Sequence, residues 1–295
     1  MTSVAVIAHA KKALEGGLPE LRRILHDEGV TEPWWREVSK SKQVGAYARA
    51  ALDDGADVIF VWGGDGTVQQ CLDAVAGSGV AIAIVPAGTA NLLATNLGIP
   101  KDIRGAVHVG LQGARRSLDL GLINGEHFAI MAGIGLDALM IRDAGAGMKD
   151  RLGRLSYVVA GAKHLRMKQV RARIRVDGKR WSKGKTSCVL FGNVGKIVGG
   201  ITAFNEAEPD DGWLEVGVVT AKGLTQWIRI AGRTAAGHPE RSPFVRTTRG
   251  RSFDIRLDRK TPYELDGGDR KPRKRFTVEI EPAAITVCVP EGEVG

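Results

Sequence analysis

Hydrophobic positions divide the chain into two parts that differ in periodicity. Across residues 1–100, short apolar runs alternate with segments whose apolar residues recur every three or four positions. The apolar runs are SVAVIA (3–8), DVIFVW (57–62) and VAIAIV (80–85). Runs that are apolar at every position are typical of strands buried on both faces, and the longer spacing is typical of helices with one buried face. The first part therefore predicts a parallel sheet with helices on both sides.

Strict alternation of apolar and polar residues marks the later part of the chain. It is present in four stretches, 171–177, 253–258, 276–281 and 285–289. A period of two predicts antiparallel strands with one face in the core and the other in water. Asp177-Gly178 has the composition of a hairpin turn. The spacing of apolar residues also predicts one helix in this part, over 151–166.

The two patterns predict an α/β protein with two domains. We place an N-terminal α/β domain with a parallel sheet at 1–125 and a β-rich domain at 126–295, with the boundary at the Asn124-Gly125 turn. A chain of 295 residues is long enough for this division, because single cores usually stop growing at about 250–300 residues. Spacing alone leaves open whether the last strands return to the first domain.

Composition excludes several classes of protein. Hydrophobic residues make up 43% of the chain and charged residues 25%, which is ordinary for a folded soluble protein. No apolar run has the length of a transmembrane helix, and the first residues lack the pattern of a secretory signal. The three cysteines lie far apart and form no disulfide framework (Cys71, Cys188 and Cys288). We therefore expect a cytoplasmic protein.

The chain carries an excess of positive charge. Lys and Arg number 42 against 33 Asp and Glu, which gives a net charge of +9. This balance suits nucleic acids, anionic membranes or phosphorylated ligands, and solvated surface is the alternative. The sequence has no zinc-ligand spacing, basic zipper or ribonucleoprotein aromatic motif. Nucleic acid is therefore not an expected partner.

A glycine-rich turn connects the second buried strand to the next predicted helix. Its residues are Gly63, Gly64, Asp65, Gly66 and Thr67. Such a turn lies at the carboxyl edge of a parallel sheet, where these folds bind ligands. Glycines let backbone N–H groups approach a ligand closely, and the end of the following helix favours a phosphate. The alternatives are a turn that only reverses the chain and, from its spacing to Gln70, a Thr67 that caps the helix.

A second turn of the same kind follows the third buried strand, over 86–91. Its Gly88, Thr89 and Asn91 can offer a backbone donor, a hydroxyl and an amide to the same cleft. Two adjacent strand ends with turns of this composition predict one phosphate-binding site. For Asn91 taken alone, a helix-capping role is an equal alternative.

With these motifs the sequence resembles the diacylglycerol kinase catalytic family, which includes bacterial lipid kinases and sphingosine kinases. The resemblance covers nearly the whole chain. It rests on GGDGTV (63–68), VPAGTANLLATNLGIP (85–100), LDLGLINGEHFAIMAGIGLDA (118–138), MKDRLGRLSYVVAG (148–161), and FGNVGKIVGG with EAEPDDGWLEV (191–216). GGDGT also occurs in NAD kinases and phosphofructokinases, whereas the combination is specific to the family.

The resemblance implies a nucleotide-binding α/β domain, a C-terminal β-sandwich, and transfer of the γ-phosphoryl group of ATP to a lipid hydroxyl with Mg²⁺. It implies that both glycine turns line the nucleotide phosphates. Asp65 and Asp119 match family aspartates that organise catalytic magnesium and water. Glu208, Asp211 and Trp213 match a divalent-ion site of the second domain, to which backbone oxygens contribute. An ordinary turn at Asp211 is the alternative.

One departure from the family concerns proton transfer. The family's Asp-Gly-Glu motif, whose glutamate is the candidate general base, is replaced by Asp266-Gly267-Gly268. Gly268 cannot accept a proton, and Asp269 follows it directly. Our hypothesis is that Asp266 and Asp269 share this acidic duty. The alternative is that the segment forms only a hairpin turn.

A basic run, 270–275, follows the acidic turn. With Arg246, Arg249 and Arg251 it could form a cationic rim at the active-site mouth. We expect this rim to dock the enzyme peripherally on an anionic membrane that holds its lipid substrate. A solvated hairpin is the alternative.

Two other functions and several properties stay open. A catalytically weakened, nucleotide-binding regulatory member of the family is one alternative, and a soluble-metabolite kinase such as an NAD kinase is the other. The missing glutamate at Gly268 favours the first, and the 86–91 turn disfavours the second. The identity of the lipid and the oligomeric state, with a homodimer as one option, are undetermined.

Overall fold

The computed structural model describes residues 2–135, 169–197, 201–202, 204–235, 238 and 241–292. The chain forms two compact units. The first is Met1–Leu120 together with Pro282–Gly295, and the second is Gly121–Glu281. The helix expected over 151–166 lies outside the described residues.

Two strands run from one unit into the other. They are β5 (Ala114–Ile123) and β16 (Gly268–Val289). The division falls at 120/121, five residues before the expected boundary, and 282–295 belong to the first unit. Thr286 and Val287 near the end of β16 pair with a strand of the first unit. The chain therefore makes the return to the first unit that its spacing left open.

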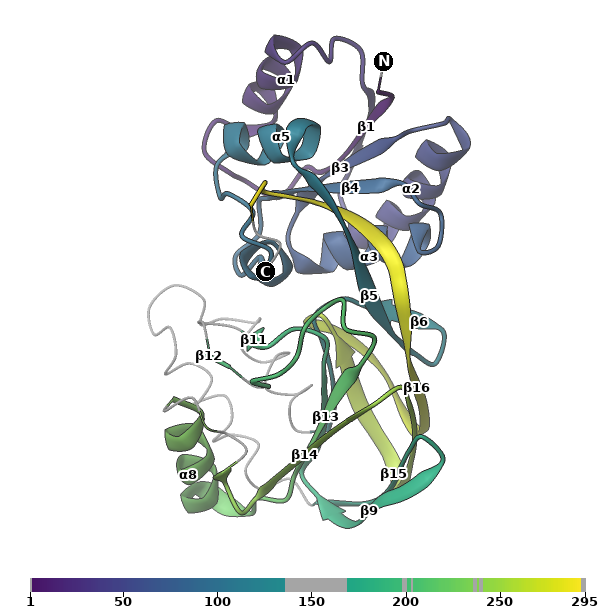
Figure 1. The fold of residues 1–295 in the computed structure, drawn as a ribbon, viewed down its shortest axis with the longest axis vertical. Helices are drawn as coiled ribbons and strands as arrows, with labels where there is room; N and C mark the ends of the chain where they lie inside the picture. Colours follow the sequence, from purple (N-terminus) through teal and green to yellow (C-terminus); the bar gives the residue numbers. More distant parts are fainter. Residues whose placement is uncertain are drawn as a thin grey trace. The chain divides into compact units, whose positions relative to one another are not determined.

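The first unit contains a parallel sheet (Figure 1). Its other strands are β1 (Val4–His9), β2 (Trp34–Val38), β3 (Val58–Gly63) and β4 (Ala81–Pro86). They lie in the order β2-β1-β3-β4, the end of β16 adds a parallel strand beside β4, and β5 pairs with β16. Every residue of β1, β3 and β4 is buried, which confirms the three apolar runs as strands covered on both faces.

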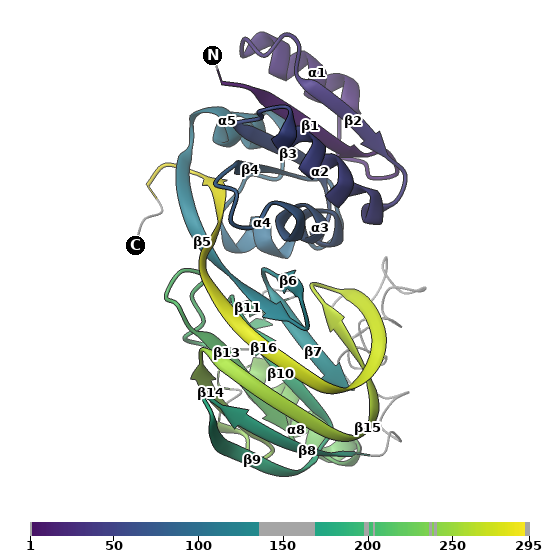
Figure 2. The same ribbon diagram turned by 90° about the vertical axis from the view of Figure 1, so that its right-hand side faces the viewer.

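Helices cover both faces of this sheet. They are α1 (Gly17–Asp27), the 3₁₀ turn η1 (Ser41–Gln43), α2 (Val44–Asp53), α3 (Asp65–Val75), α4 (Leu92–Asn96) and α5 (Ile103–Gln112). Figures 1 and 2 show α1 and α5 on one face and α2 and α3 on the other. On the first face, Phe60 of β3 joins one hydrophobic cluster with Leu21 of α1 and Val107 of α5.

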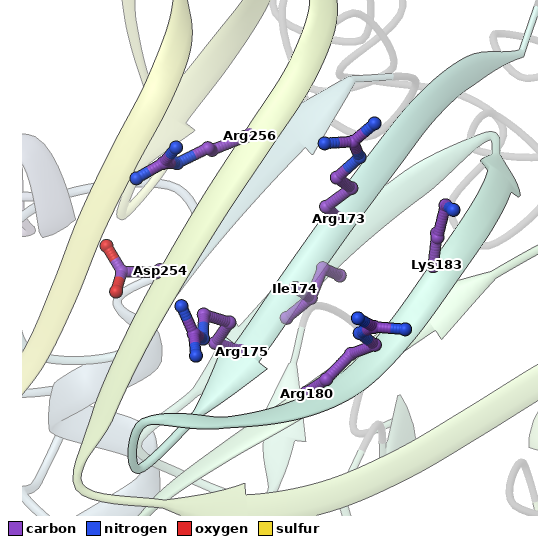
Figure 3. Close-up of a pocket in the computed structure, with 7 residues that line it drawn as sticks. All are labelled: Arg173, Ile174, Arg175, Arg180, Lys183, Asp254 and Arg256. Atoms are coloured by element: carbon purple, nitrogen blue, oxygen red, sulfur yellow. The ribbon is translucent and has the colours of Figure 1, made fainter.

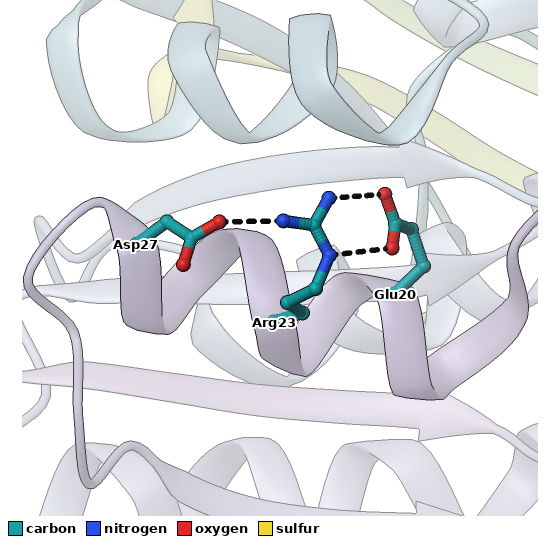
Figure 4. Close-up of polar contacts among 3 residues, drawn as sticks. All are labelled: Glu20, Arg23 and Asp27. Atoms are coloured by element: carbon teal, nitrogen blue, oxygen red, sulfur yellow. Dashed lines mark hydrogen bonds and ion pairs between the residues drawn. The ribbon is translucent and has the colours of Figure 1, made fainter.

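The two sides of α1 show how one helix meets both core and water. Leu21 and Leu25 are buried against the sheet. On the exposed side, the Arg23 guanidinium donates two hydrogen bonds to Glu20, at 2.9 and 2.7 Å, and one to Asp27 at 2.7 Å (Figure 4). Pairs three and four residues apart stabilise a helix modestly, so these contacts of Arg23 support α1 locally.

The second unit is built from antiparallel strands. Besides β5 and β16 they are β6 (Glu126–Phe128), β7 (Met131–Gly135), β8 (Val170–Val176), β9 (Lys179–Thr186), β10 (Cys188–Gly192), β11 (Lys196–Ile197), β12 (Ile201–Thr202), β13 (Leu214–Val219), β14 (Val245–Gly250) and β15 (Ser252–Leu265). The path β14-β13-β10-β7-β15-β16 runs through it, and β8 joins β15 to β9. One described helix, α8 (Gly223–Ala235), accompanies them. The alternating residues of 171–177, 253–258 and 276–281 point alternately into the core and to water, as predicted. The prediction was wrong for 285–289, where every residue except Thr286 is buried and Thr286 and Val287 pair with β4 in parallel, because this segment joins the sheet of the first unit.

Three hairpin turns of this unit share one backbone conformation. They are Asn124-Gly125 (φ 52 and 88), Asp177-Gly178 (φ 47 and 74) and Asp266-Gly267 (φ 46 and 80). Two-residue hairpins need positive φ at both positions, and Asn-Gly and Asp-Gly tolerate it best. The first two confirm the turns expected from composition. The third is the hairpin alternative that the sequence left open.

The contact between α5 and the sheet depends on one residue without a side chain. A Cβ on Gly110 would lie 2.4 Å from the Phe60 ring and 2.8 Å from the Ala83 Cβ. We expect Gly110→Ala to lower the free energy of unfolding by about 1–3 kcal/mol, because a packed core resists added volume. Chemical denaturation would measure the change.

Gly232→Ala is the matched control for this prediction. Gly232 is also helical, and a Cβ there would meet nothing within 4 Å. Because alanine favours helix by about 1 kcal/mol over glycine, this variant should be as stable as the parent or more so. Equal stability of the two variants would contradict the close packing of α5.

Candidate functional site

Three loops of the first unit meet at one edge of its sheet. They follow β1, β3 and β4, which are neighbours in the parallel sheet. Parallel strands bring their carboxyl ends to the same edge, and in open α/β sheets ligands bind there. The two glycine turns predicted as a phosphate site follow β3 and β4, so the fold brings them together.

The turn after β3 leads directly into α3. Gly63 ends the strand, Gly64 is the N-cap residue, and the backbone N–H groups of Thr67 and Val68 donate to the Gly64 carbonyl at 2.8 and 3.1 Å. Thr67 therefore lies inside the helix and does not cap it. Its side chain is 1% exposed, and its Oγ1 lies 3.3 Å from the Ser41 Oγ.

Gly66 presents the open part of this turn. It is exposed in the first turn of α3, and a Cβ there would meet no atom within 4 Å. The first N–H groups of a helix lack partners within the helix, and the helix dipole favours an anion beside them. The backbone of Gly66 therefore reaches water with no side chain over it.

The second glycine turn packs directly on the first. A Cβ on Gly88 would lie 2.4 Å from the Gly64 Cα, and one on Gly64 would lie 3.0 Å from the Gly88 Cα. The Ala87 N–H also donates to the Gly63 carbonyl at 2.9 Å. Two backbones can approach this closely only where both residues are glycine. The predicted pair of turns is thus one continuous surface.

The side chain of Asn91 lies within the second turn, whereas one of our two expectations was that its amide faces a ligand. Its Oδ1 accepts from the Gly88 N–H at 2.9 Å, and its Nδ2 donates to the Pro86 and Gly88 carbonyls at 3.0 and 2.9 Å. The side chain is 8% exposed, and the residue has a left-handed φ of 49°. Asn91 therefore shapes the turn with its amide and does not present the amide to a ligand. Thr89 is exposed beside it.

Asp65 connects the two turns through a side chain. Its Oδ1 accepts from the Leu93 N–H, at the start of α4, at 3.3 Å. Burial raises the pKa of Asp65, and hydrogen bonds from the backbone of Leu93 and its neighbours oppose that rise. A carboxylate held this way is positioned by two loops and keeps part of its surface in water.

The loop after β1 brings two lysines to the same edge. Lys11 is exposed and Lys12 half-buried, and the Trp62 Nε1 donates to the Lys12 carbonyl at 3.1 Å. His9 ends the strand almost buried, and burial followed by the charge of Lys12 lowers its pKa. Our sequence interpretation missed these lysines. Their position directly after a buried strand was the available signal, but only the order β1-β3-β4 shows which turns they accompany.

Asp119 lies on β5 and is 3% exposed. Its Oδ1 accepts from the Ala283 N–H at 2.8 Å, and Ala283 has a left-handed φ of 49°. Asp119 therefore stabilises an irregular residue of β16, the strand that separates β5 from β4 in the sheet. Its assignment to magnesium stays a prediction.

In the second unit, Asp266 is built into the protein. It is 6% exposed, its Oδ2 accepts from the Ala129 N–H at 2.8 Å, and its Oδ1 accepts from the Ile130 and Met131 N–H groups, both at 2.9 Å. Its own N–H donates to the Met131 carbonyl at 3.0 Å. Asp266 thus joins the β15–β16 turn to the segment before β7. Both carboxylate oxygens of Asp266 accept backbone hydrogen bonds. The geometry therefore does not support Asp266 as a proton acceptor, which was one part of our hypothesis.

Two other carboxylates flank the same turn. Glu264 is fully buried, and its Oε2 accepts from the Gly267 N–H at 2.8 Å. Asp269 is exposed on β16, opposite Glu264 in the strand register. Of the two aspartates predicted to share the acidic duty, Asp269 is therefore the one in contact with water. Sequence reasoning assigned nothing to Glu264, whose burial no local pattern indicated.

The predicted divalent-ion residues lie around the turn before β13. Glu208 is exposed, Trp213 is half-buried, and the Asp211 Oδ1 accepts from the Trp213 N–H at 2.9 Å. Glu215 follows on β13 and is 8% exposed. Burial raises the pKa of Glu215 to about 7, and the nearby carboxylates of Glu206 and Asp211 add to the rise.

Carboxylates that repel one another in this way fit a hard divalent cation, which prefers oxygen ligands. In the described ranges, however, no group of three or more His, Cys, Asp and Glu side chains is arranged to hold a metal ion. Backbone oxygens would have to complete any such site. Glu206 and Glu215 are the acidic neighbours that the sequence interpretation missed.

Comparison with known proteins agrees with the resemblance seen in the sequence. The family described as "Diacylglycerol kinase catalytic domain" matches residues 4–123, and "YegS C-terminal NAD kinase beta sandwich-like domain" matches residues 130–289. "Probable lipid kinase YegS-like" of Klebsiella pneumoniae (strain 342) is 28% identical over 289 residues, which are 97% of this chain and 95% of that protein. "Diacylglycerol kinase" of Mycobacterium tuberculosis (strain CDC 1551 / Oshkosh) is 28% identical over 248 residues, 82% of this chain and 79% of that protein.

A solved structure has the same fold. The crystal structure of a diacylglycerol kinase from Bacillus anthracis strain Sterne superposes with a TM-score of 0.78 at 22% identity and covers 99% of this chain and 98% of its own. The family matches and this fold define a phosphotransferase of the kinase class. The chain belongs to the diacylglycerol kinase catalytic family and carries the YegS type of C-terminal domain. Among the described residues, no helix has the length and hydropathy to cross a bilayer.

The contacts of Asp266 and Asp269 predict effects of different size for the same substitution. Asp266→Asn puts an amide NH₂ group where backbone N–H groups now donate. We expect it to lower the free energy of unfolding by about 1–3 kcal/mol, because hydrogen bonds to a buried charged group are lost. Asp269→Asn, on an exposed residue, should change it by less than about 0.5 kcal/mol. Equal denaturation midpoints for the two variants would contradict the structural role that we assign to the hydrogen bonds of Asp266.

Proposed function

We propose that this protein is an ATP-dependent lipid kinase that transfers the γ-phosphoryl group to a lipid hydroxyl such as that of diacylglycerol. The observation that carries the proposal is the single glycine surface formed by Gly64 and Gly88 at the carboxyl edge of the parallel sheet. Its support is membership of a lipid kinase family with matches along both units. The names of the relatives suggest the class of acceptor.

The first unit supplies the proposed phosphate site. Gly63, Gly64, Gly66 and Gly88 keep side chains away from the phosphates, and the start of α3 offers backbone donors and a positive dipole end. Thr89 is exposed at the rim of the surface. Lys11 and Lys12 add positive charge at the same edge. Phosphoryl transfer depends mainly on such positioning and charge neutralisation.

Magnesium supplies charge neutralisation when bound to the nucleotide. Asp65 is the residue that we assign to it, because its carboxylate is fixed between the two turns and remains partly accessible. Asp119 is the second expected aspartate. Asp211, with Glu208 and the backbone at Trp213, is the proposed divalent-ion site of the second unit.

Proton acceptance from the lipid hydroxyl falls to Asp269 in this proposal. Asp266 acts as a positioning residue, since both of its oxygens accept backbone hydrogen bonds. General-base help is typically worth about 10²–10⁴-fold, so a kinase that lacked it would be slow but not inactive. The enzyme is proposed to act in the cytoplasm at the membrane surface.

A regulatory, nucleotide-binding protein is the second candidate function. The observation that favours it is the turn itself, where Gly268 replaces the expected glutamate and Asp266 is buried. This candidate predicts ATP binding without turnover. It differs from the first only in whether phosphate leaves the nucleotide for a lipid.

Incubation with γ-labelled ATP, Mg²⁺ and a mixed lipid extract tests the proposal. We expect a labelled lipid, and a loss on the order of 10²-fold or more in kcat for Asp65→Asn, because a neutral amide would hold Mg²⁺ at the phosphates less well than the carboxylate. Asp54→Asn, at an exposed position that ends α2, is the matched control and should keep full activity.

The possible outcomes separate the candidates. Bound ATP without any labelled product would assign the regulatory function. A label on NAD and none on lipid would assign a soluble-metabolite kinase. Full activity of Asp65→Asn would remove Asp65 from the site.

A divalent-ion site in the second unit predicts that metal stabilises the fold. We expect Mg²⁺ or Ca²⁺ at 10–100 times its Kd to raise the free energy of unfolding by roughly 1–3 kcal/mol. Asp211→Asn should remove this effect, and the neighbouring Asp210→Asn should keep it. Thermal unfolding with metal and with a chelator measures both. Stabilisation of Asp211→Asn equal to that of the parent would exclude Asp211 as a ligand.

A further inference from the structure

We propose that the outer face of the sheet formed by β8, β9, β15 and β16 is a docking surface for an anionic phospholipid bilayer. The inference rests on the proposed function, because a lipid kinase must reach a substrate held in a membrane. It goes beyond that function by naming the surface that makes the contact.

One row of cations crosses four neighbouring strands. The strand register places Lys183 of β9 opposite Arg173 of β8, Arg173 opposite Arg256 of β15, and Arg256 opposite Arg275 of β16. All of these side chains are exposed. We call these four residues the cationic row. Directly opposed like charges destabilise a sheet, so the row weakens the fold that carries it.

More cations flank the row. Arg171 lies opposite Lys185, and Arg175 lies opposite Arg180. On the other side Arg175 faces Asp254, a carboxylate within this face. In the part of the chain that the structure describes, no member of the cationic row forms an ion pair. The positive charges of the cationic row are therefore available to an external anion, whose binding would reduce their mutual repulsion.

The face is hollowed at its centre. A groove of about 380 Å³ is lined by Arg173, Ile174, Arg175, Arg180, Lys183, Asp254 and Arg256. Figure 3 shows that its basic side chains come from β8, β9 and β15 and spread across the face, with Asp254 between Arg256 and Arg175. Guanidinium groups bind phosphate oxygens in pairs, so a surface of phosphodiester headgroups matches this array.

The chemistry of the face favours a bilayer over a nucleic acid. Sheet faces that bind single-stranded nucleic acids stack bases on aromatic side chains. The outward positions of the strand register between β9, β8, β15 and β16 hold Arg, Lys, Asp, Glu, Ser and Thr, with Glu279 as a second carboxylate beside Asp254, and no aromatic residue within the described segments. Trp181, the aromatic residue of β9, packs against the hydrophobic core instead.

Four of the arginines expected to form a rim have partners inside the protein. The guanidinium of Arg249 lies 5.3 Å from the centre of the Trp213 ring, and that of Arg251 lies 4.7 Å from it. Arg246 lies 5.5 Å from the Trp181 ring, and Arg270 is bonded to Glu126. Arg275 of the predicted rim belongs to the cationic row, so the proposed surface keeps that residue and replaces these four arginines with the outward cations of β8, β9 and β15.

Sedimentation with vesicles tests the surface. The probe is vesicles of phosphatidylglycerol and phosphatidylcholine, compared with phosphatidylcholine alone, without ATP. Each basic residue near an anionic surface contributes roughly fivefold to binding. We expect the triple variant Arg173→Gln, Lys183→Gln, Arg256→Gln to bind the anionic vesicles on the order of 100-fold more weakly. Because repulsion within the sheet is removed, its melting temperature should be equal to that of the parent or higher.

The matched control removes the same charge elsewhere. Arg49→Gln, Lys101→Gln, Arg104→Gln changes three exposed residues of the first unit and should bind almost as well as the parent. Equal losses in both triple variants, or equal binding to neutral and anionic vesicles, would overturn the proposal. Binding to a duplex oligonucleotide but not to the vesicles would also overturn it and would assign the surface to nucleic acid. The vesicle assay contains no ATP, so it measures membrane binding separately from catalysis. A failure to phosphorylate lipid in the kinase assay would refute the proposed function and would not change the vesicle-binding result.

Discussion

The backbone contact between Gly64 and Gly88 is the constraint on which the first unit's site depends. A methyl group on Gly88 would push the turns after β3 and β4 apart, and one on Gly64 would crowd the Gly88 Cα. Asn91 and Asp65 then hold the contact in place, one from inside the second turn and one across both turns. The resulting surface offers backbone donors and few side chains, which is what a phosphate chain requires.

Several carboxylates that the sequence suggested as catalytic or metal-binding residues instead stabilise the backbone of turns and strands. Asp266 receives three backbone hydrogen bonds in the second unit, and Asp119 supports a left-handed residue of β16 in the first. Buried carboxylates persist in folded proteins when hydrogen bonds compensate for their lost hydration. Asp65 and Asp269, in contrast, keep contact with water.

Charge is divided unevenly over the second unit. Arg246, Arg249 and Arg251 lie over tryptophan rings, whereas the cationic row opposes like charges across four strands. The first arrangement satisfies positive charge within the protein. The second leaves it directed outward, which links the excess of Lys and Arg in the composition to one particular face.

Local sequence was sufficient for the buried strands of the first unit, for the hairpin turns and for the family. Runs such as 57–62 can be buried only as central strands, and Asp-Gly and Asn-Gly pairs tolerate the positive φ of tight hairpins. Local sequence could not show which side chains form hydrogen bonds or cross-strand contacts with residues far away in the chain. Asp266 meets Ala129, Arg256 meets Arg173 and Arg275, and the end of β16 meets β4 only because the chain folds back on itself. Burial and strand register, which are properties of the tertiary structure, therefore decided which of the predicted residues remain exposed to water.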